Sequence, residues 1–311
     1  MTDWRPTASL AALQARASLY RQVRDFFQAR NVLEVDTPAL AQHGVTDLHI
    51  DCIAVPGYGF LQSSPEYHMK RLLAAGSGSI YQISKVFRDG EAGKKHNPEF
   101  TLLEWYRTGF SLQQLIDESV ALLQQLLSRT SVQQFSFRDI FRRVTGLDPL
   151  AASQQSLQDY AQQHSALPTL TKAELVDWLM ACVVEKALPE DGLTVITDFP
   201  GWAAALAQTR EDSDGEMIAE RFEIYAGSLE LANGYHELRD ATEQEKRFAA
   251  DQQLRAQHER QSRDADPHLL AALQHGLPDC SGVAIGLDRV LMAQLGAQTI
   301  AEVIPFPSDR A

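Results

Sequence analysis

Apolar side chains recur with helical spacing near the start of the chain. Across residues 9–30 they fall at every third or fourth position, namely Leu10, Leu13, Ala17, Tyr20, Val23 and Phe27. This spacing predicts an amphipathic helix, and Ser9 can cap its first turn. Residues 32–35 are predicted to form a short strand that ends before Pro38, because proline has no N–H to donate to a neighbouring strand.

Two predicted hairpins follow. The β-rich stretches at residues 79–88 and 100–108 are separated by a polar loop at 89–99. This pattern is typical of an antiparallel hairpin, and the loop is long enough to have a functional role. A second hairpin is predicted at residues 222–225 and 229–233, around a tight turn.

Helical patterns account for much of the remaining chain. Helices are predicted at residues 111–129, 172–186 and 242–263, and a strand of small residues at 282–286 leads into a helix at 287–295. Hairpins with helices around them predict an α+β fold, in which helices surround an antiparallel sheet.

The composition is that of a folded enzyme rather than a disordered or fibrous chain. Of 311 residues, 44% are hydrophobic and 22% are charged, which fits one large domain or two small ones. The net charge of −13 disfavours a nucleic-acid partner, although a local basic patch could still bind one. Cys52, Cys182 and Cys280 show no paired spacing, so we expect reduced thiols. No stretch suits a membrane span or a secretion signal, and we expect a cytoplasmic protein.

Several common catalytic motifs are absent from the sequence. It contains no P-loop, no dinucleotide-binding glycine motif after a strand, no H-E-x-x-H zinc motif and no G-x-S-x-G serine-hydrolase motif. The commonest types of nucleotide-binding, zinc and serine enzyme are therefore unsupported.

Phosphate-binding groups gather at the loop of the first predicted hairpin. Arg88 stands at the start of the loop, and His96 and Asn97 stand near its end. A guanidinium offers a planar fork of N–H groups, and an imidazole and an amide add donors that suit phosphate oxygens. A charged hairpin tip without a ligand is the alternative.

The second strand of this hairpin combines aromatic and acidic side chains. Alternation along a strand places Phe100, Leu102, Glu104 and Tyr106 on one face. A core would reject Glu104 unless it were paired, and a solvent face gains little from Phe100. A ligand pocket would satisfy both residues.

Glu223 and Glu230 flank the turn of the second hairpin. Two close carboxylates repel each other unless a cation lies between them, and oxygen-rich pairs beside phosphates commonly hold Mg²⁺. Exposed hairpin carboxylates are an equally common alternative. Asn233, Tyr235 and Glu237 then alternate on one face and add an amide, a ring and a further carboxylate.

Carboxylates outnumber cations around Glu66, Glu104 and Glu237, so a ligand that carries amines would complement these stretches. Near the end of the chain, Gly286 allows close approach of a ligand to the backbone. Arg289 follows in the first turn of a helix, where anions are favoured.

Together and in this order, these segments resemble the catalytic domain of class II aminoacyl-tRNA synthetases of the lysyl type. The helix, strand and proline ending at Pro38 resemble motif 1 of that class, residues 86–100 resemble motif 2, and residues 282–289 resemble motif 3. A closer resemblance, covering nearly the whole chain, is to truncated paralogues of lysyl-tRNA synthetase. It is carried by SSPEYHMK at 63–70, ELANGYHEL at 230–238 and CSGVA at 280–284.

The resemblance implies a role for each candidate residue. The implied catalytic residues are Arg88 and Arg289. The implied ATP contacts are Arg88, Asp89, Gly90, His96, Asn97, Phe100, Glu230, Leu231, Gly286 and Arg289. The implied contacts to a lysine-like substrate are Ser64, Pro65, Glu66, Glu104, Tyr106, Asn233, Glu237 and Ala284, and the implied Mg²⁺ ligands are Glu223 and Glu230.

Two positions distinguish this chain from lysyl-tRNA synthetases and their relatives. The family usually has a glutamate two residues after the motif 2 arginine, where this chain has Gly90, and Asp89 or Glu91 could substitute for it. At motif 3, lysyl-tRNA synthetases have glycine where this chain has Ala284. One added methyl group in a pocket typically discriminates by about 1–3 kcal/mol, which would favour a substrate with a shifted amine.

The resemblance also implies an activity and its partners. We expect an ATP-dependent, AMP-forming ligase that activates (R)-β-lysine as an acyl-adenylate and transfers it to a lysine of elongation factor P. A homodimer is implied as well. The family's N-terminal OB-fold, of roughly a hundred residues, does not fit ahead of a helix that starts near residue 9. We therefore expect residues 1–311 to form a single catalytic domain without anticodon-dependent tRNA binding.

Two alternatives stay open at this point. The first is an enzyme that activates α-lysine for a tRNA-like acceptor. The second is a non-catalytic paralogue that binds lysine or a nucleotide. The set of Arg88, Glu230 and Arg289 argues against the second alternative, because a binding module needs no pair of arginines directed at pyrophosphate.

Overall fold

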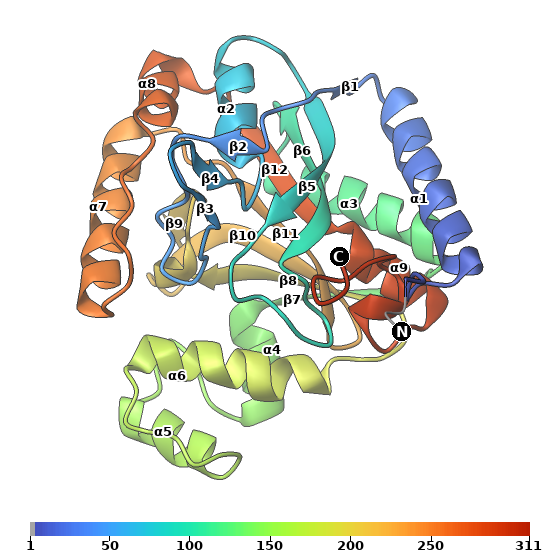
Figure 1. The fold of residues 1–311 in the computed structure, drawn as a ribbon. Coiled ribbons are helices and arrows are strands. Elements are labelled where there is room, and N and C mark those ends of the chain that lie inside the picture. Colours follow the sequence, from blue (N-terminus) through green and yellow to red (C-terminus); the bar gives the residue numbers. More distant parts are fainter. Residues whose placement is uncertain (1–3) are drawn as a thin grey trace. The chain divides into compact units, whose positions relative to one another are not determined.

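The computed structural model describes residues 4–311, which divide into two units. The first unit contains the chain up to Ser128 together with Glu237–Ala311, and the second unit contains Arg129–His236. In Figure 1 the first unit is therefore blue to green and orange to red, and the second is green to orange.

The sheet of the first unit contains the predicted motif 2 hairpin. In spatial order its strands are β1 (Leu33–Glu34), β5 (Ile80–Phe87), β6 (Glu99–Thr108) and β12 (Cys280–Gly286). Strand β6 is antiparallel to both β5 and β12, as predicted. The predicted α+β class is confirmed, but the sheet is mixed and not antiparallel throughout, because β1 runs parallel to β5. Parallel neighbours need a long crossover, and helix α2 (Glu66–Ala74) lies in the chain between these two strands.

Three helices of the first unit pack together against one face of this sheet (Figure 1). They are α1 (Leu10–Gln28), α3 (Leu112–Leu127) and α9 (Leu287–Leu295), each within a few residues of its predicted bounds. Ser9 caps α1 by accepting a hydrogen bond from the backbone N–H of Ala12. The ring of Phe27 stacks on Tyr81 at 4.4 Å and meets the edge of Trp105 at 5.2 Å. These aromatic contacts fix α1 against β5 and β6.

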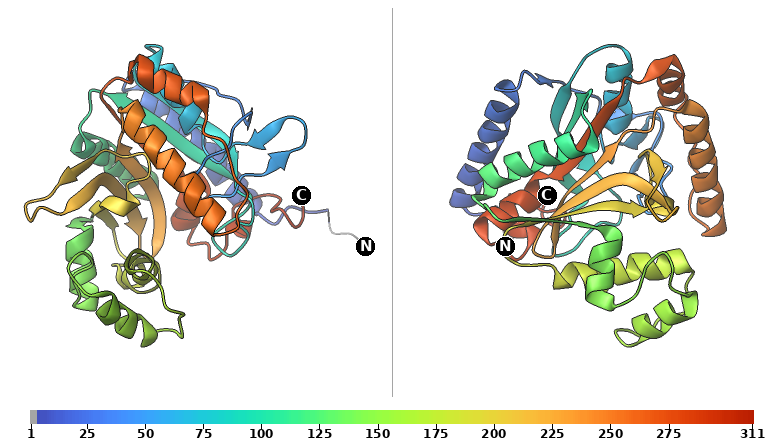
Figure 2. Two further views of the ribbon diagram at one scale, coloured as in Figure 1. Left: turned by 90° about the vertical axis from the view of Figure 1, so that its left-hand side faces the viewer. Right: turned by 180° about the vertical axis from the view of Figure 1, so that it is seen from behind.

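The rest of the first unit surrounds helix α2. It comprises a small sheet, β2 (Leu40–Ala41), β4 (Gly59–Leu61) and β3 (Ala54–Val55), and the adjacent helices α7 (Ala241–Gln257) and α8 (Pro267–Gly276), which Figure 2 shows from two further sides. Helix α7 ends at Gln257 and not at residue 263 as predicted. Beyond its end, Arg260 and Arg263 turn back to bind Asp51, at 2.6 and 2.9 Å, so tertiary ion pairs override the helical pattern.

The second unit contains the other predicted hairpin. In spatial order its strands are β11 (Leu229–His236), β10 (Met217–Ala226), β8 (Leu193–Pro200) and β7 (Val132–Ser136), with β9 (Thr209–Glu211) beside β10. Strands β10 and β11 are antiparallel, as predicted, but β7 and β8 are parallel. The chain between β7 and β8 forms the helices α4 (Phe137–Thr145), α5 (Gln154–Gln162) and α6 (Lys172–Leu179), which provide the crossover that parallel strands need.

These helices share one hydrophobic core with β8 and β10. Its buried members include Phe141 of α4, Leu157 of α5, Leu175 of α6 and Phe199 of β8. The helix predicted at 172–186 is α-helical only to Leu179 and continues as a π-helical and then a 3₁₀ turn to Ala187. The second unit is thus a packed layer of helices on a sheet.

The cysteines and the helices agree with two expectations from the composition. Cys52, Cys182 and Cys280 are free thiols, as predicted. Within residues 4–311, no helix has both the length and the apolar surface that crossing a bilayer requires.

Candidate active site

Strand β6 buries both of its faces. Leu103 and Trp105 have no exposed surface, and the Trp105 side chain donates a hydrogen bond to Glu118 of α3 at 3.1 Å. Because side chains alternate along a strand, Glu104 and Tyr106 lie on the opposite face. They are only 3% and 2% exposed, so this face contains a buried carboxyl group that needs polar partners.

The partners of Glu104 are hydroxyl groups. Its two carboxylate oxygens accept hydrogen bonds from Ser64 Oγ at 2.7 Å and from the Tyr106 hydroxyl at 2.6 Å. Burial raises the pKa of Glu104 to about 8, repulsion from Glu66 adds to this, and the two hydroxyl groups oppose it. Glu104 is therefore mostly protonated at neutral pH. A ligand cation at this position would favour its ionised form.

A buried lysine lies between the other two predicted substrate carboxylates. Lys70 Nζ is 2.7 Å from Glu66 Oε1 and 2.6 Å from Glu237 Oε2, and Lys70 is only 1% exposed. Burial by itself would lower the pKa of Lys70, but the two carboxylates outweigh burial and raise it. A cation of the protein therefore already complements two of these carboxylates, and the ligand that carries amines stays a prediction. The sequence does carry the signal, since Glu66 and Lys70 are four residues apart on a helix.

Strand β12 presents only small residues beside Glu104. The antiparallel register places Ala284 opposite Glu104 and Gly282 opposite Tyr106. A Cβ atom at Gly282 would lie 2.3 Å from Tyr106 Cε1 and 2.5 Å from Glu237 Oε1. Glycine at this position lets the phenol and the carboxylate approach the strand. The methyl group of Ala284 is therefore the side chain of β12 that lies nearest Glu104 across the ladder.

The motif 2 loop reaches helix α9. Arg289 Nη2 is 2.6 Å from His96 Nε2, so two of the predicted phosphate-binding groups meet. The Arg88 guanidinium lies over the Phe100 ring, 5.1 Å from its centre, and is 3.6 Å from the Glu91 carboxylate. Arg88 Nε is buried and has no hydrogen-bond partner within residues 4–311. Its N–H group could therefore donate a hydrogen bond to an oxygen atom of a ligand.

Buried polar contacts fix both ends of this arrangement. Asp288, in the first turn of α9, accepts a hydrogen bond from the Thr101 N–H at 2.7 Å and pairs with Arg16 at 2.5 Å. These contacts join α9 and α1 to β6, which places Arg289 relative to the hairpin. Asn97 is 6% exposed; it donates to the Glu99 carbonyl at 2.7 Å and accepts from the Ser308 N–H at 3.0 Å. Its implied phosphate contact stays a prediction.

The other predicted residues of the first unit occupy turns and helix ends. Gly90 has a φ of +75° in the motif 2 loop, with open space where a side chain would be, and the Asp89 N–H donates to the Asp51 carbonyl at 2.7 Å. Pro65 immediately precedes α2, and the partly exposed Gly286 immediately precedes α9.

In the second unit, Glu223 lies opposite Asn233 on the β10–β11 hairpin. Arg221, which the sequence reasoning missed, is 2.5 Å from Glu223 Oε1 and 3.2 Å from Asn233 Oδ1. Its position two residues from Glu223 puts it on the same strand face, which is the signal that could have found it. Leu231 is 2% exposed, and its side chain belongs to the core. Its implied contact with ATP would therefore use backbone groups.

The two predicted metal ligands are neighbours but do not face each other directly. In the register of the hairpin, Glu223 lies opposite Asn233, and Tyr225 lies opposite Glu230. Burial raises the pKa of Glu223; Arg221 opposes this and repulsion from Glu230 adds to it. Within residues 4–311, no group of three or more histidine, cysteine or acidic side chains is arranged to hold a metal ion. A carboxylate pair still fits Mg²⁺, which is commonly held by one or two carboxylates together with substrate phosphates and water.

Comparison with known proteins gives a consistent result. The family model described as tRNA synthetases class II (D, K and N) matches residues 1–310. A protein of Haemophilus ducreyi is 45% identical, with 99% of this chain and 97% of that protein covered, and one of Mannheimia succiniciproducens is 46% identical, with 99% and 98% covered. A protein of Vibrio cholerae is 43% identical, with 100% and 99% covered. Each of the three is named elongation factor P–(R)-β-lysine ligase.

Proposed function

Because the chain belongs to the class II tRNA synthetases of the D, K and N type, we propose that it is an ATP-dependent ligase that attaches (R)-β-lysine to elongation factor P. The observation that carries this proposal is the buried acidic cluster on the first unit's sheet. Glu104, beside Ala284, has two hydroxyl groups as its hydrogen-bond partners among the described residues, and Glu66 and Glu237 share one lysine. The cluster keeps a net negative charge that suits a small diamine.

The first step activates the amino acid. A carboxylate oxygen of (R)-β-lysine attacks the α-phosphorus of ATP, the bond to the β-phosphate oxygen breaks, and pyrophosphate leaves. Arg88 and Arg289 stabilise the negative charge that shifts onto the phosphate oxygens, and His96 orients Arg289. Glu223 and Glu230 would hold Mg²⁺, and a bound Mg²⁺ would supply further positive charge for the reaction.

The second step transfers the amino acid to the acceptor protein. The neutral ε-amine of an elongation factor P lysine attacks the carbonyl carbon of the acyl-adenylate. An amide bond forms, AMP leaves and the amine loses a proton. No nucleophile from this chain is needed, because holding the amine beside a bound anhydride replaces a slow bimolecular encounter.

Recognition of the substrate follows from the charges and the shape of the cluster. Glu104 ionises when one ammonium group of the substrate binds to it. Beside it, Glu66 and Glu237 are both paired with Lys70, and these three side chains together keep a negative charge. Ser64, Pro65, Tyr106 and Asn233 complete the proposed substrate contacts. The Ala284 methyl group narrows the pocket relative to glycine and thereby favours the β-amino isomer.

Several further assignments belong to this proposal. The two units act as one catalytic domain, since the family model matches both. The protein acts as a homodimer through the motif 1 helix and strand, without anticodon-dependent tRNA binding, and it works in the cytoplasm with its acceptor. The adenine ring stacks on Phe100 once Arg88 has moved to the phosphates, with Asp89 or Glu91 compensating for Gly90.

One assay tests the function and its alternatives together. The purified protein is incubated with ATP, (R)-β-lysine or α-lysine, elongation factor P and tRNA, and mass spectrometry follows which acceptor gains mass while AMP is measured. We expect elongation factor P to gain one β-lysyl group. Charging of tRNA with α-lysine would establish the first alternative, and no AMP with either isomer would establish a non-catalytic binding protein.

A further inference from the structure

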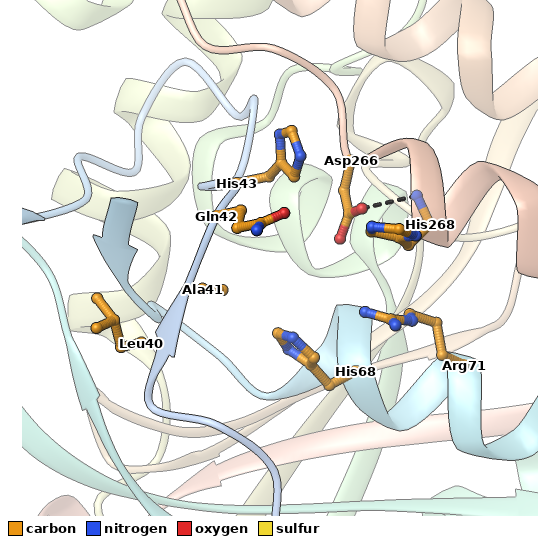
Figure 3. A pocket seen from close by; sticks show the side chains of 8 residues that line it. All are labelled: Leu40, Ala41, Gln42, His43, His68, Arg71, Asp266 and His268. Carbon is orange, nitrogen blue, oxygen red and sulfur yellow. Dashed lines mark hydrogen bonds between the residues drawn. The ribbon is translucent and has the colours of Figure 1, made fainter. Parts of the chain in front are cut away.

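A pocket of about 250 Å³ lies in the first unit, and its lining includes Gln42, His43, His68, Arg71, Asp266 and His268 (Figure 3). None of these residues belongs to the proposed ATP or lysine sites. Successive residues of an α-helix turn by about 100°, so Glu66 and Lys70 share one face of α2 while His68 and Arg71 project from the opposite face. The pocket is therefore distinct from the acidic cluster.

The lining of this pocket is rich in hydrogen-bond donors. Three imidazoles, one guanidinium and one amide come from three separate segments: the end of β2, helix α2 and the start of α8 (Figure 3). Asp266 is the acidic member among them. Its carboxylate caps α8 by accepting the His268 N–H at 2.8 Å, so the helix terminus already uses it.

Two of the donors lack protein partners. The Arg71 side chain makes no hydrogen bond or ion pair within residues 4–311. Carboxylates are plentiful in a chain with a net charge of −13, and most of the arginines described above pair with one. His68 Nδ1 is buried and also has no hydrogen-bond partner in this part of the chain. Within residues 4–311, the cavity therefore holds a guanidinium without an acceptor and a buried ring nitrogen without a hydrogen-bond partner.

We propose that this pocket binds a small oxyanion, a phosphate or carboxylate group held by the fork of Arg71 and by the imidazoles around it. The volume supports a single anionic group. Pockets for drug-sized ligands are roughly 300–1,000 Å³, so a complete nucleotide does not fit into about 250 Å³. This chemistry belongs equally to a free phosphate ion and to an acidic group on the acceptor protein.

The test titrates inorganic phosphate into protein labelled with ¹⁵N-histidine. Imidazole resonances of His43, His68 and His268 should shift along one saturating curve, whereas His96 reports separately on the proposed ATP site. Arg71→Gln should weaken this binding by roughly tenfold or more, and Arg71→Lys should weaken it less, because it keeps the charge but loses the fork. The matched control is Arg24→Gln, which removes an exposed arginine paired with Glu34 and should leave the affinity unchanged.

The proposal is overturned if the three pocket histidines do not respond to phosphate, or if Arg71→Gln and Arg71→Lys bind it as tightly as the wild type. Acceptor kinetics then identify the source of the anion. A higher KM for elongation factor P in Arg71→Gln, with unchanged pyrophosphate exchange, assigns the pocket to an acidic group of the acceptor. An unchanged KM assigns it to a free phosphate ion. The acceptor kinetics rest on the proposed function, whereas the phosphate titration does not. Failure of the anion site and failure of the proposed function can therefore be distinguished.

Discussion

Both units bury carboxylates on their sheets, but they provide different partners for them. In the second unit, Glu223 has a guanidinium at 2.5 Å and a second carboxylate nearby. In the first unit, Glu104 has two hydroxyl donors and, within residues 4–311, no paired cation, while Glu66 and Glu237 share Lys70. A carboxylate pair suits a metal ion, whereas a single carboxyl group among hydroxyl groups suits an ammonium group. We therefore propose that Mg²⁺ binds at Glu223 in the second unit and that an ammonium group binds at Glu104 in the first unit.

The largest expected effect comes from removing the internal cation of the first unit. Lys70→Met should lower the free energy of unfolding by about 3–5 kcal/mol, because the buried Glu237 and the half-buried Glu66 would both lose the cation that they share. Urea denaturation measures this loss. The control is Lys85→Met, which breaks a half-exposed pair with Glu99 and should cost less than about 1 kcal/mol. An equal decrease in the free energy of unfolding in the two variants would show that Lys70 does not stabilise the negative charges of Glu66 and Glu237.

The next effect separates phosphate binding from the fold. Arg289→Ala should reduce ATP–pyrophosphate exchange by about 10²–10³-fold, since it removes a donor to the charge that develops on the phosphates. The free energy of unfolding should change little, because Arg289 is partly exposed and contacts His96 across the loop. Retained exchange in this variant would contradict its proposed role.

A smaller effect concerns the shape of the pocket beside Glu104. Ala284→Gly should shift the preference between lysine isomers toward α-lysine by about 1–3 kcal/mol, roughly 10- to 100-fold, because it removes the one methyl group on this face of β12. The ratio of kcat/KM for the two isomers in pyrophosphate exchange measures the shift. An unchanged ratio would mean that the methyl group does not select the substrate.

The smallest expected effect is a change in the affinity for (R)-β-lysine with pH. Because the pKa of Glu104 is raised to about 8, most of this group is protonated at pH 7, and binding of an ammonium group should release close to one proton. Affinity for (R)-β-lysine should therefore increase up to about tenfold per unit as the pH rises toward 8, and level off above it. Calorimetry in buffers of different ionisation enthalpy measures the proton. Glu104→Gln should abolish its release; persistent release in that variant would point to another group.

Features that depend on neighbouring residues could be predicted from the amino-acid sequence. The spacing of apolar side chains defined α1, alternation placed Glu104 and Tyr106 on one face of β6, and turn residues defined the two hairpins. Arg88, His96 and Arg289 could be selected because their motifs combine side-chain chemistry with a predicted loop or helix start. These signals are local, so one sequence is sufficient to find them.

Which charged groups pair with each other could not be predicted and became evident from the three-dimensional fold. Glu66, Lys70 and Glu237 meet although Glu237 is far away in the chain, and Arg260 and Arg263 end the helical pattern early to bind Asp51. The donor-rich pocket likewise combines three distant segments that show no common pattern. The physical reason is that burial and ion pairing depend on distances in space, and periodicity along the chain does not contain those distances.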